Sequence, residues 1–331
     1  MIITKPTYFD TFHCIAGRCP DSCCKEWDVL VDSEKAALYR ALPGPLGDRL
    51  RSVLNDEDGE IYMEIENGRC PMWRTDGLCR IQAELGEDAL CKTCREFPRL
   101  THDYGDFIEY GLELSCPEAA RIILENPNPT FVSREIPGGE APEYDALDME
   151  SLLRTREEAR QILSNSRWSV GETLALLLMH GYRAQAELNG AEVTDADNTN
   201  VLENARSFAR PGDTAEMIEF FQNLEILTPE WSARLDSPSP AGWESLHLTL
   251  ARYFVDRYWL QAISDFDLVG RVKFAIASCL LVKILGGDPV RTAQLYSKEI
   301  ENSIENVEAI LDGVYESRAF TDDRILGLLL L

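Results

Sequence analysis

The cysteines are the residues of this sequence most able to do chemistry. Nine of the ten lie within the first 116 residues, in two tight groups. The first group is Cys14, Cys19, Cys23 and Cys24, and the second is Cys70, Cys79, Cys91, Cys94 and Cys116. The rest of the chain holds only Cys279. Such a density of soft sulfur donors indicates a bound metal or an iron–sulfur cluster. A disulfide framework is the competing interpretation.

The spacing within each group narrows the choice of metal. The first group, C-x4-C-x3-C-C, lets several sulfurs converge from one short loop, and its adjacent pair could serve one cluster, two sites, or a ligand plus a packing group. The second group contains a CxxC pair, Cys91 and Cys94. This spacing is common for two cysteines that bind the same zinc ion or the same iron–sulfur cluster. Structural zinc sites commonly have two such pairs, and nine thiolates exceed the needs of one tetrahedral zinc. We therefore favour a [4Fe-4S] cluster and keep zinc as the alternative.

Composition limits the partners of this chain. Its 331 residues carry a formal net charge of −25, which would repel the phosphates of nucleic acids. No apolar run approaches the roughly 20 residues that span a bilayer, so we expect no membrane insertion. The N-terminus lacks the apolar segment of a secretory signal. We therefore expect a cytoplasmic protein, and disulfides are rare in that compartment.

The pattern along the chain predicts a mainly α fold, with a cysteine-rich metal-binding N-terminal module followed by a helical C-terminal domain. The module is expected over residues 1–125. A stretch with prolines at 127, 129, 137 and 142 predicts a linker or extended connection over 126–147. Apolar residues at helical spacing then predict a helical domain over 148–331.

Several helix signals in that domain are specific. Ser169 and Glu172 fit a capping box, and Thr228 followed by Pro229 fits a cap with proline in the first turn. The ranges 246–262 and 268–285 predict long, mostly buried helices, and 292–311 predicts one exposed amphipathic helix. His180 and His247 lie in apolar helical runs, where a histidine packed in the core is expected.

Five segments of the chain together resemble the flagellin lysine N-methylases. Three are cysteine-bearing: CCKEW (23–27), CPMWRTDGLCRIQAELGEDALCKTCREFPR (70–99) and SCPEAARIIL (115–124). Two come from the helical half: YFVDRYWL (253–260) and LVGRVKFAIASCLL (268–281). The C-x3-C-C and C-P-x-x…G-L-C elements are also similar to a broader group of zinc- or iron-chelating proteins.

The resemblance implies an enzyme that moves a methyl group from S-adenosylmethionine to lysine ε-amines of flagellin. It also implies an iron–sulfur cluster held by cysteines. The matching positions are Cys14, Cys19, Cys23, Cys24, Cys70, Cys79, Cys94 and Cys116. Cys91 occupies a variable position of the pattern and lies outside this set.

The sequence assigns neither a catalytic residue nor a binding site for the methyl donor. It contains no G-x-G of a Rossmann-type methyltransferase and no C-x3-C-x2-C of a radical enzyme that uses the same donor. Our hypothesis is that S-adenosylmethionine binds beside the cluster. His102 and His13 are candidate bases, because a lysine ammonium must lose a proton before it can accept a methyl group.

Aromatic and acidic side chains near the cysteines could form a lysine channel. They are Trp27, Trp73, Tyr104, Tyr110, Glu109, Glu113 and Glu118. Core packing of the rings and a solvated acidic surface are the alternative interpretations.

Two further functions compete with the methyltransferase. The first is a non-catalytic zinc- or iron-binding interaction module, in which the cysteines support the fold and the helices bind a partner. The second is an electron-transfer or redox-sensing protein, which the absence of a flavin or nicotinamide fingerprint weakens.

Overall fold

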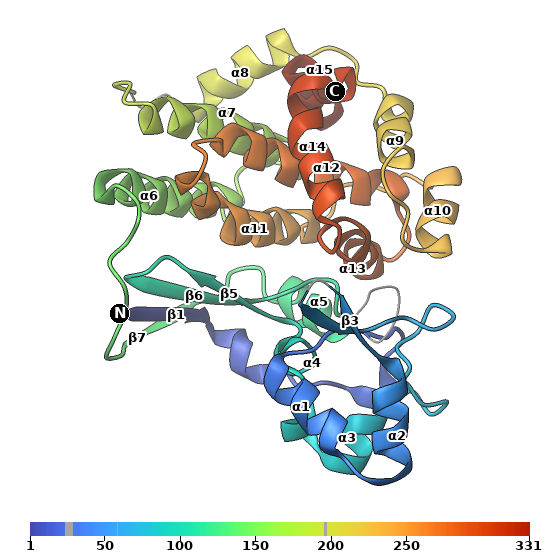
Figure 1. The fold of residues 1–331 in the computed structure, drawn as a ribbon. Helices are drawn as coiled ribbons and strands as arrows, with labels where there is room; N and C mark the ends of the chain where they lie inside the picture. The colour runs from blue at the N-terminus through green and yellow to red at the C-terminus, as the bar shows by residue number, and fades with distance from the viewer. Residues whose placement is uncertain (24–28, 58, 195–196) are drawn as a thin grey trace.

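A computed structural model describes residues 1–331 except 24–28, 58 and 195–196. The described chain has a helical half, above in Figure 1, and a smaller part below that carries two sheets and short helices. The mainly α fold is therefore confirmed, and two small sheets that the pattern did not predict accompany it. In the described part of the chain, no helix is long and apolar enough to cross a membrane.

A mixed four-stranded sheet lies beneath the helices, with the strand order β5-β6-β1-β7. Strand β1 pairs in parallel with β6, placing Ile3 opposite Ile108, and runs antiparallel to β7 on its other side. Strands β5 and β6 form an antiparallel pair in which His102 lies opposite Glu109. The strands are β1 (Ile2–Pro6), β5 (Arg99–Asp103), β6 (Phe107–Leu112) and β7 (Phe131–Glu135).

The remaining N-terminal elements build a small core of their own. A three-stranded antiparallel sheet, with the order β2-β4-β3, packs with short helices around Tyr39, Leu50 and Met72. Cys70 and Cys91 belong to this core, and Cys79 and Cys94 pack against it. The strands are β2 (Val29–Leu30), β3 (Leu54–Glu57) and β4 (Glu60–Met63). The helices are α1 (Ser33–Ala41), α2 (Gly44–Val53), α3 (Arg80–Leu85) and α4 (Lys92–Glu96).

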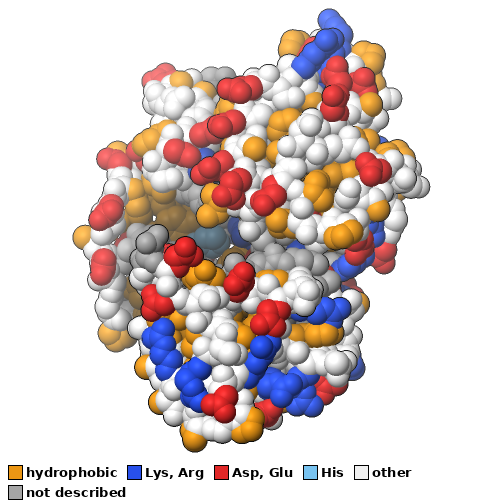
Figure 2. Space-filling view, turned by 45° about the vertical axis from the view of Figure 1, so that its right-hand side comes forward, with side chains coloured by type: hydrophobic (Ala, Val, Ile, Leu, Met, Phe, Trp, Pro, Cys, Tyr) orange, Lys and Arg blue, Asp and Glu red, His pale blue; other side chains and the backbone are white. Residues whose placement is uncertain are grey.

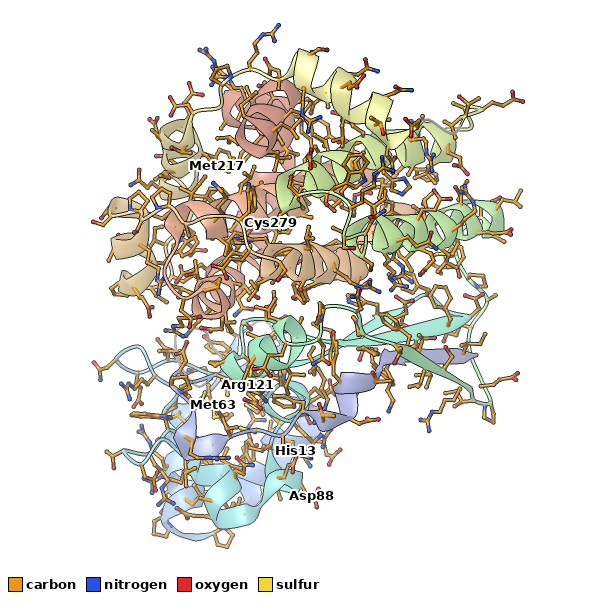
Figure 3. The ribbon with its side chains drawn as sticks, turned by 180° about the vertical axis from the view of Figure 1, so that it is seen from behind. His13, Met63, Asp88, Arg121, Met217 and Cys279 are labelled. Carbon is orange, nitrogen blue, oxygen red and sulfur yellow. The ribbon has the colours of Figure 1, made fainter. Side chains whose placement is uncertain are left out.

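The helical half has one large core, which also takes in Phe12, Leu114 and helix α5 (Pro117–Leu124). Helix α12 lies at its centre, with nearly every residue buried, and contacts α7, α11, α13 and α14. Figure 3 places Cys279 of this helix in the middle of the helical half. The helices are α6 (Ala146–Leu163), α7 (Val170–Leu188), α8 (Asn198–Phe208), α9 (Thr214–Gln222), α10 (Pro229–Asp236), α11 (Leu246–Tyr258), α12 (Leu268–Leu285), α13 (Pro289–Ile300), α14 (Ile304–Glu316) and α15 (Asp322–Leu330).

Local signals predicted several helix boundaries correctly. The capping box of α7 forms as expected, with Ser169 and Glu172 bonding reciprocally. The Thr228 side chain caps α10, which has proline in its first turn. The apolar range 268–285 is one buried helix, as predicted. The expected helix over 246–262 ends at Tyr258, and a 3₁₀ turn, Trp259–Ile263, follows it.

One helix prediction is wrong. Residues 292–311 do not form a single exposed helix: α13 ends at Ile300, and α14 begins at Ile304 after Ser303 caps it. Residues 292–300 are all buried, because α13 packs between α5, α10 and α12. Its amphipathic pattern arises from polar side chains that are buried with partners, such as Glu299 and Gln294.

The proline-rich connection over 126–147 contains strand β7, which joins the edge of the mixed sheet. The division into a module over 1–125 and a domain over 148–331 stays a prediction.

Candidate functional site

Three of the N-terminal cysteines lie at the start of helices. Cys79, Cys91 and Cys116 are the N-cap residues of α3, α4 and α5. Backbone N–H groups of the first turns bond to the sulfurs of Cys79 and Cys116 and lower their pKa, although burial has the larger, opposing effect. N–H donors at a helix start favour thiolate over thiol, and thiolate is the form that binds metal. The local fold therefore suits these side chains to the role of metal ligands.

The second cysteine group gathers in space. The pKa of Cys79 is raised by burial and by the neighbouring charges of Cys70 and Cys23. A hydrogen bond between the sulfurs of Cys91 and Cys94 lowers the pKa of Cys91 and raises that of Cys94. Cys23 and Cys70 also act on Cys94. One neighbourhood therefore holds Cys23 together with all four of these residues.

Cysteines of the first group lie close to Cys116 in the fold. Burial raises the pKa of Cys116 to about 12, with contributions from Cys19 and Cys23. Cys19 in turn interacts with Cys14 and Cys23. Cys23 is therefore common to both neighbourhoods, which its position in the sequence did not reveal.

Cys24 and Trp27 lie outside the described residues. Among the described ones, no group of three or more His, Cys, Asp or Glu side chains has the arrangement of a metal site. Cys14, Cys19, Cys79, Cys91, Cys94 and Cys116 carry free thiols. Cys279 is also a free thiol, fully buried in the helical core, with its sulfur donating to the His247 carbonyl at 3.5 Å.

The donor set fits a thiolate-bound metal in its chemistry. Sulfur ligands that approach from several elements and repel one another as thiolates are stabilised when a cation lies between them. Cys91 joins this gathering through its hydrogen bond with Cys94, although the family pattern leaves it out. The ligand set itself stays a prediction.

A buried carboxylate ties the first cysteine loop to the helical half. The side chain of Asp21 is 3% exposed and pairs with Lys298 and Arg291 of α13, each at 3.3 Å. Beside it, a hollow of about 530 Å³ is lined by Cys19, Asp21, Arg69 and Trp73, among others. The guanidinium of Arg69 stacks on the Trp73 ring at 3.7 Å.

A second feature, whose place in the fold the sequence did not predict, is a cavity with both apolar and charged walls between the mixed sheet and helices α6 and α11. Its empty volume is about 490 Å³, including its mouth. Figure 2 shows the junction of the helical half with the part below it as a visible hollow. The lining comes from η1 (Thr7–Thr11), from β1, β5, β6 and β7, and from both helices. We call it the sheet–helix cavity.

Buried ion pairs form the helix side of the sheet–helix cavity. Arg156 donates two hydrogen bonds to Glu109, at 2.7 and 2.6 Å, and its side chain is 4% exposed. These bonds help to lower the pKa of Glu109, against the opposing effect of burial. Arg160 donates to Asp256 at 2.7 Å.

Arg257 is the centre of a second buried network beside the cavity. It donates to the Tyr253 hydroxyl at 2.6 Å and pairs with the fully buried Glu301 at 3.1 Å. Tyr258 donates to Glu301 at 2.8 Å. Burial raises the pKa of Glu113, which Arg257 counteracts and Glu301 reinforces.

The residues that the sequence offered as bases and as a lysine channel do not all lie at one site. His102 and Tyr110 line the sheet–helix cavity, and Glu109 lies opposite His102 across the strand pair. Trp73 lines the hollow beside Cys19 instead, and Tyr104 stacks on Phe107 at 4.7 Å.

The other candidates have ordinary structural places. His13 is exposed. Glu118 pairs with Arg121 at 2.7 Å on the surface of α5. His180 is buried, and its Nε2 donates to the Thr155 carbonyl at 2.8 Å. His247 is buried as expected, but its Nε2 has no hydrogen-bond partner among the described residues.

Comparison with known proteins decides the family. The flagellar biosynthetic protein FliU of Salmonella muenchen is 33% identical over 136 residues, which are 38% of this chain and 79% of that protein. The chain belongs to the flagellin lysine methylase family. The resemblance inferred from the cysteine motifs is thereby confirmed.

Longer relatives of the flagellin lysine methylase family match a similar share of the chain. The lysine-N-methylases of Salmonella typhimurium and Salmonella choleraesuis are each 32% identical over 143 residues, which are 40% of this chain and 35% of either protein. The matched region thus spans about a third of the length of these two relatives. No family model matches the chain. No solved structure matches it either.

Proposed function

We propose that this protein transfers a methyl group from S-adenosylmethionine to lysine ε-amines of flagellin, and that the transfer depends on a [4Fe-4S] cluster held by its N-terminal cysteines. The observation that carries the proposal is the likeness to proteins named lysine-N-methylase and FliU. The gathering of thiols in two neighbourhoods that share Cys23 supports the cluster.

The cysteines that would hold the cluster are those of the predicted set, with Cys91 as a further candidate beside Cys94. Thiolates of both neighbourhoods are within reach of Cys23, which suits a centre with more than one iron better than a single zinc. The cluster would supply a soft cation that neutralises these thiolates. Zinc remains the alternative.

S-adenosylmethionine supplies a methyl group activated by its sulfonium. We place its binding site beside the thiols, since the hollow lined by Cys19, Arg69 and Trp73 adjoins them. The Trp73 ring would stack on the adenine of the donor, and the Arg69 guanidinium would pair with the donor's carboxylate. If the donor binds equally well after complete removal of the metal, this placement is wrong.

Transfer itself is tested by incubating anaerobically purified protein with flagellin and methyl-labelled S-adenosylmethionine. The expected result is label on flagellin lysines, located by mass spectrometry of peptides. Flagellin whose lysines have been acetylated beforehand is the matched control, because an amide nitrogen accepts no methyl group, and it should take up no label. A protein that contains its cluster and still leaves untreated flagellin unlabelled would overturn the proposal.

A further inference from the structure

We propose that the sheet–helix cavity receives the substrate lysine side chain, and that His102 removes the proton from its ammonium group. The inference rests on the proposed function and adds to it a site and a base. Nothing in the cysteine motifs points to this cavity, since it is assembled from strands and helices far apart in the sequence.

The walls of the cavity have the chemistry that holds an alkylammonium group. Tyr8, Tyr110 and Phe131 contribute aromatic rings, and Glu109 and Asp256 contribute carboxylates. Ring faces attract cations, and apolar walls accommodate the methylene stem of a lysine. The mouth is open, as an entering side chain of another protein requires.

The arginines around the cavity do not repel such a cation, because each is paired with a carboxylate. Arg160 bonds to Asp256 at 2.7 Å, and Arg257 pairs with Glu301 at 3.1 Å. Arg156 is held by Glu109 in the same way. The positive charge of the walls is therefore balanced within the walls.

His102 differs from the other polar groups of the cavity in having a ring free to act. Within the part of the chain that the structure describes, neither ring nitrogen forms a hydrogen bond. The pKa of His102 is lowered by burial, and Arg257 and Arg156 lower it further while Glu109 raises it. The imidazole is therefore neutral near pH 7 and can accept a proton.

The groups that face His102 come from every element around it. Glu109 lies on the neighbouring strand, and Tyr8 enters from η1. Arg160 enters from α6, whose Arg156 also acts on His102 through its charge, and Asp256 and Arg257 enter from α11. Burial also raises the pKa of Tyr8, so its hydroxyl keeps its proton and adds no negative charge.

The proton passes from the lysine ammonium group to His102. One N–H bond of the lysine ammonium breaks, its electron pair stays on nitrogen, and the proton forms a bond to an imidazole nitrogen of His102. Desolvation in the cavity lowers the amine pKa from its usual value near 10.4 toward that of histidine. The Glu109 carboxylate across the strand pair stabilises the imidazolium. The proton then leaves through the open mouth.

The chain itself connects the cavity to the thiols. Leu112 lines the cavity at the end of β6, and only residues 113–115 separate it from Cys116. Leu114 and Ser115 are both buried, and the amide of Leu114 donates to Tyr253 at 3.5 Å. A short, largely buried stretch of chain therefore joins the cavity to the cysteine that begins α5.

Binding is tested first, without catalysis, by histidine-selective NMR, because the chain has only four histidines. A peptide with one lysine is titrated into the protein, beside the same peptide with norleucine. The expected result is a saturable shift of the His102 signal with the lysine peptide alone. Equal shifts with both peptides, or none with either, would overturn the cavity assignment whatever the activity of the protein.

The role of the base is tested with His102→Gln, beside His13→Gln as the exposed control. His102→Gln is expected to lower kcat about 10²- to 10⁴-fold and to remove the acid limb of the pH profile, with lysine-peptide binding retained. His13→Gln should match the unaltered protein. If His102→Gln keeps both the rate and the acid limb, His102 is not the base. A wild-type protein that binds the peptide but transfers no methyl group would instead refute the proposed function.

Discussion

We propose that two sets of residues carry the chemistry of this protein, the N-terminal cysteines and the lining of the sheet–helix cavity. The type and spacing of the cysteines predict from the sequence alone that they bind a metal, and this role stays a prediction. The place of the sheet–helix cavity could not be predicted in this way, although His102, Glu109 and Tyr110 were candidates from the sequence. The supporting pair of Glu109 and Arg156 is 47 positions apart and joins a strand and a helix that no local pattern pairs. Only the fold brings them together.

The buried ion pair of Glu109 and Arg156 predicts a large effect of a single substitution on the stability of the protein. Glu109→Gln removes the negative partner of a guanidinium whose side chain is 4% exposed. We expect the free energy of unfolding to fall by about 3–5 kcal/mol, because a buried charge is left uncompensated. Chemical denaturation measures the change.

The matched control for that substitution is Asp56→Asn. Asp56 pairs with Arg40 at 3.3 Å, but both side chains are about half exposed, at 57% and 47%. Water screens this pair, so the loss should stay below about 1 kcal/mol. Similar small losses at both sites would show that the Glu109 pair is not a buried structural contact.

At the scale of elements, the sequence was most informative where one physical signal dominated. Helix α12 could be predicted because most of its side chains are apolar, and nearly all of its residues are buried in the structure. The break between α13 and α14 could not, because Ser303 caps α14 within a range whose apolar spacing continues across it. The mixed sheet was also missed, since β1 pairs in parallel with a strand about a hundred residues away.

The packing of α6 against α7 predicts a dependence of stability on pH. His180 is buried between them, and burial lowers its pKa below the usual value near 6.5. As pH falls through 6.5, the unfolded chain binds a proton that the folded chain does not, so the free energy of unfolding falls. Each unit of difference between the two pKa values is worth about 1.4 kcal/mol.

Denaturation curves at pH 7.5 and 5.5 measure this effect, with His180→Gln beside the unaltered protein. The substituted glutamine can still donate to the Thr155 carbonyl but does not titrate, so the loss between the two pH values should be smaller in the variant. An identical loss in both proteins would assign the pH dependence to other groups, such as His247.

The residues that the structure describes form two hydrophobic cores of unequal size. The larger unites the helices with α5, and the smaller surrounds Tyr39 and Met72 and includes Cys70 and Cys91. The larger core is rich in apolar side chains, and of the gathered cysteines that the structure describes only Cys116 packs against it. The smaller one borders the gathered thiols, so a bound metal would contribute directly to its stability.

Removing the metal should therefore destabilise the smaller core and leave the larger core folded. We expect anaerobic chelation to abolish hydrogen-exchange protection around Tyr39 and Met72, while the amides of α12 stay protected. Exchange measured by mass spectrometry distinguishes the two regions. Uniform loss of protection across both cores, or no loss in either, would contradict this division of stability.

The proposed [4Fe-4S] cluster requires that the N-terminal thiols surround inorganic iron. Quantifying iron and acid-labile sulfide in anaerobically purified protein tests it most directly, with Cys94→Ser and Cys279→Ser measured in parallel. We predict iron and sulfide in equal amounts, reduced by Cys94→Ser and unchanged by Cys279→Ser, whose thiol lies in the helical core. Protein that contains neither iron nor sulfide, or that holds zinc instead, would contradict the claim.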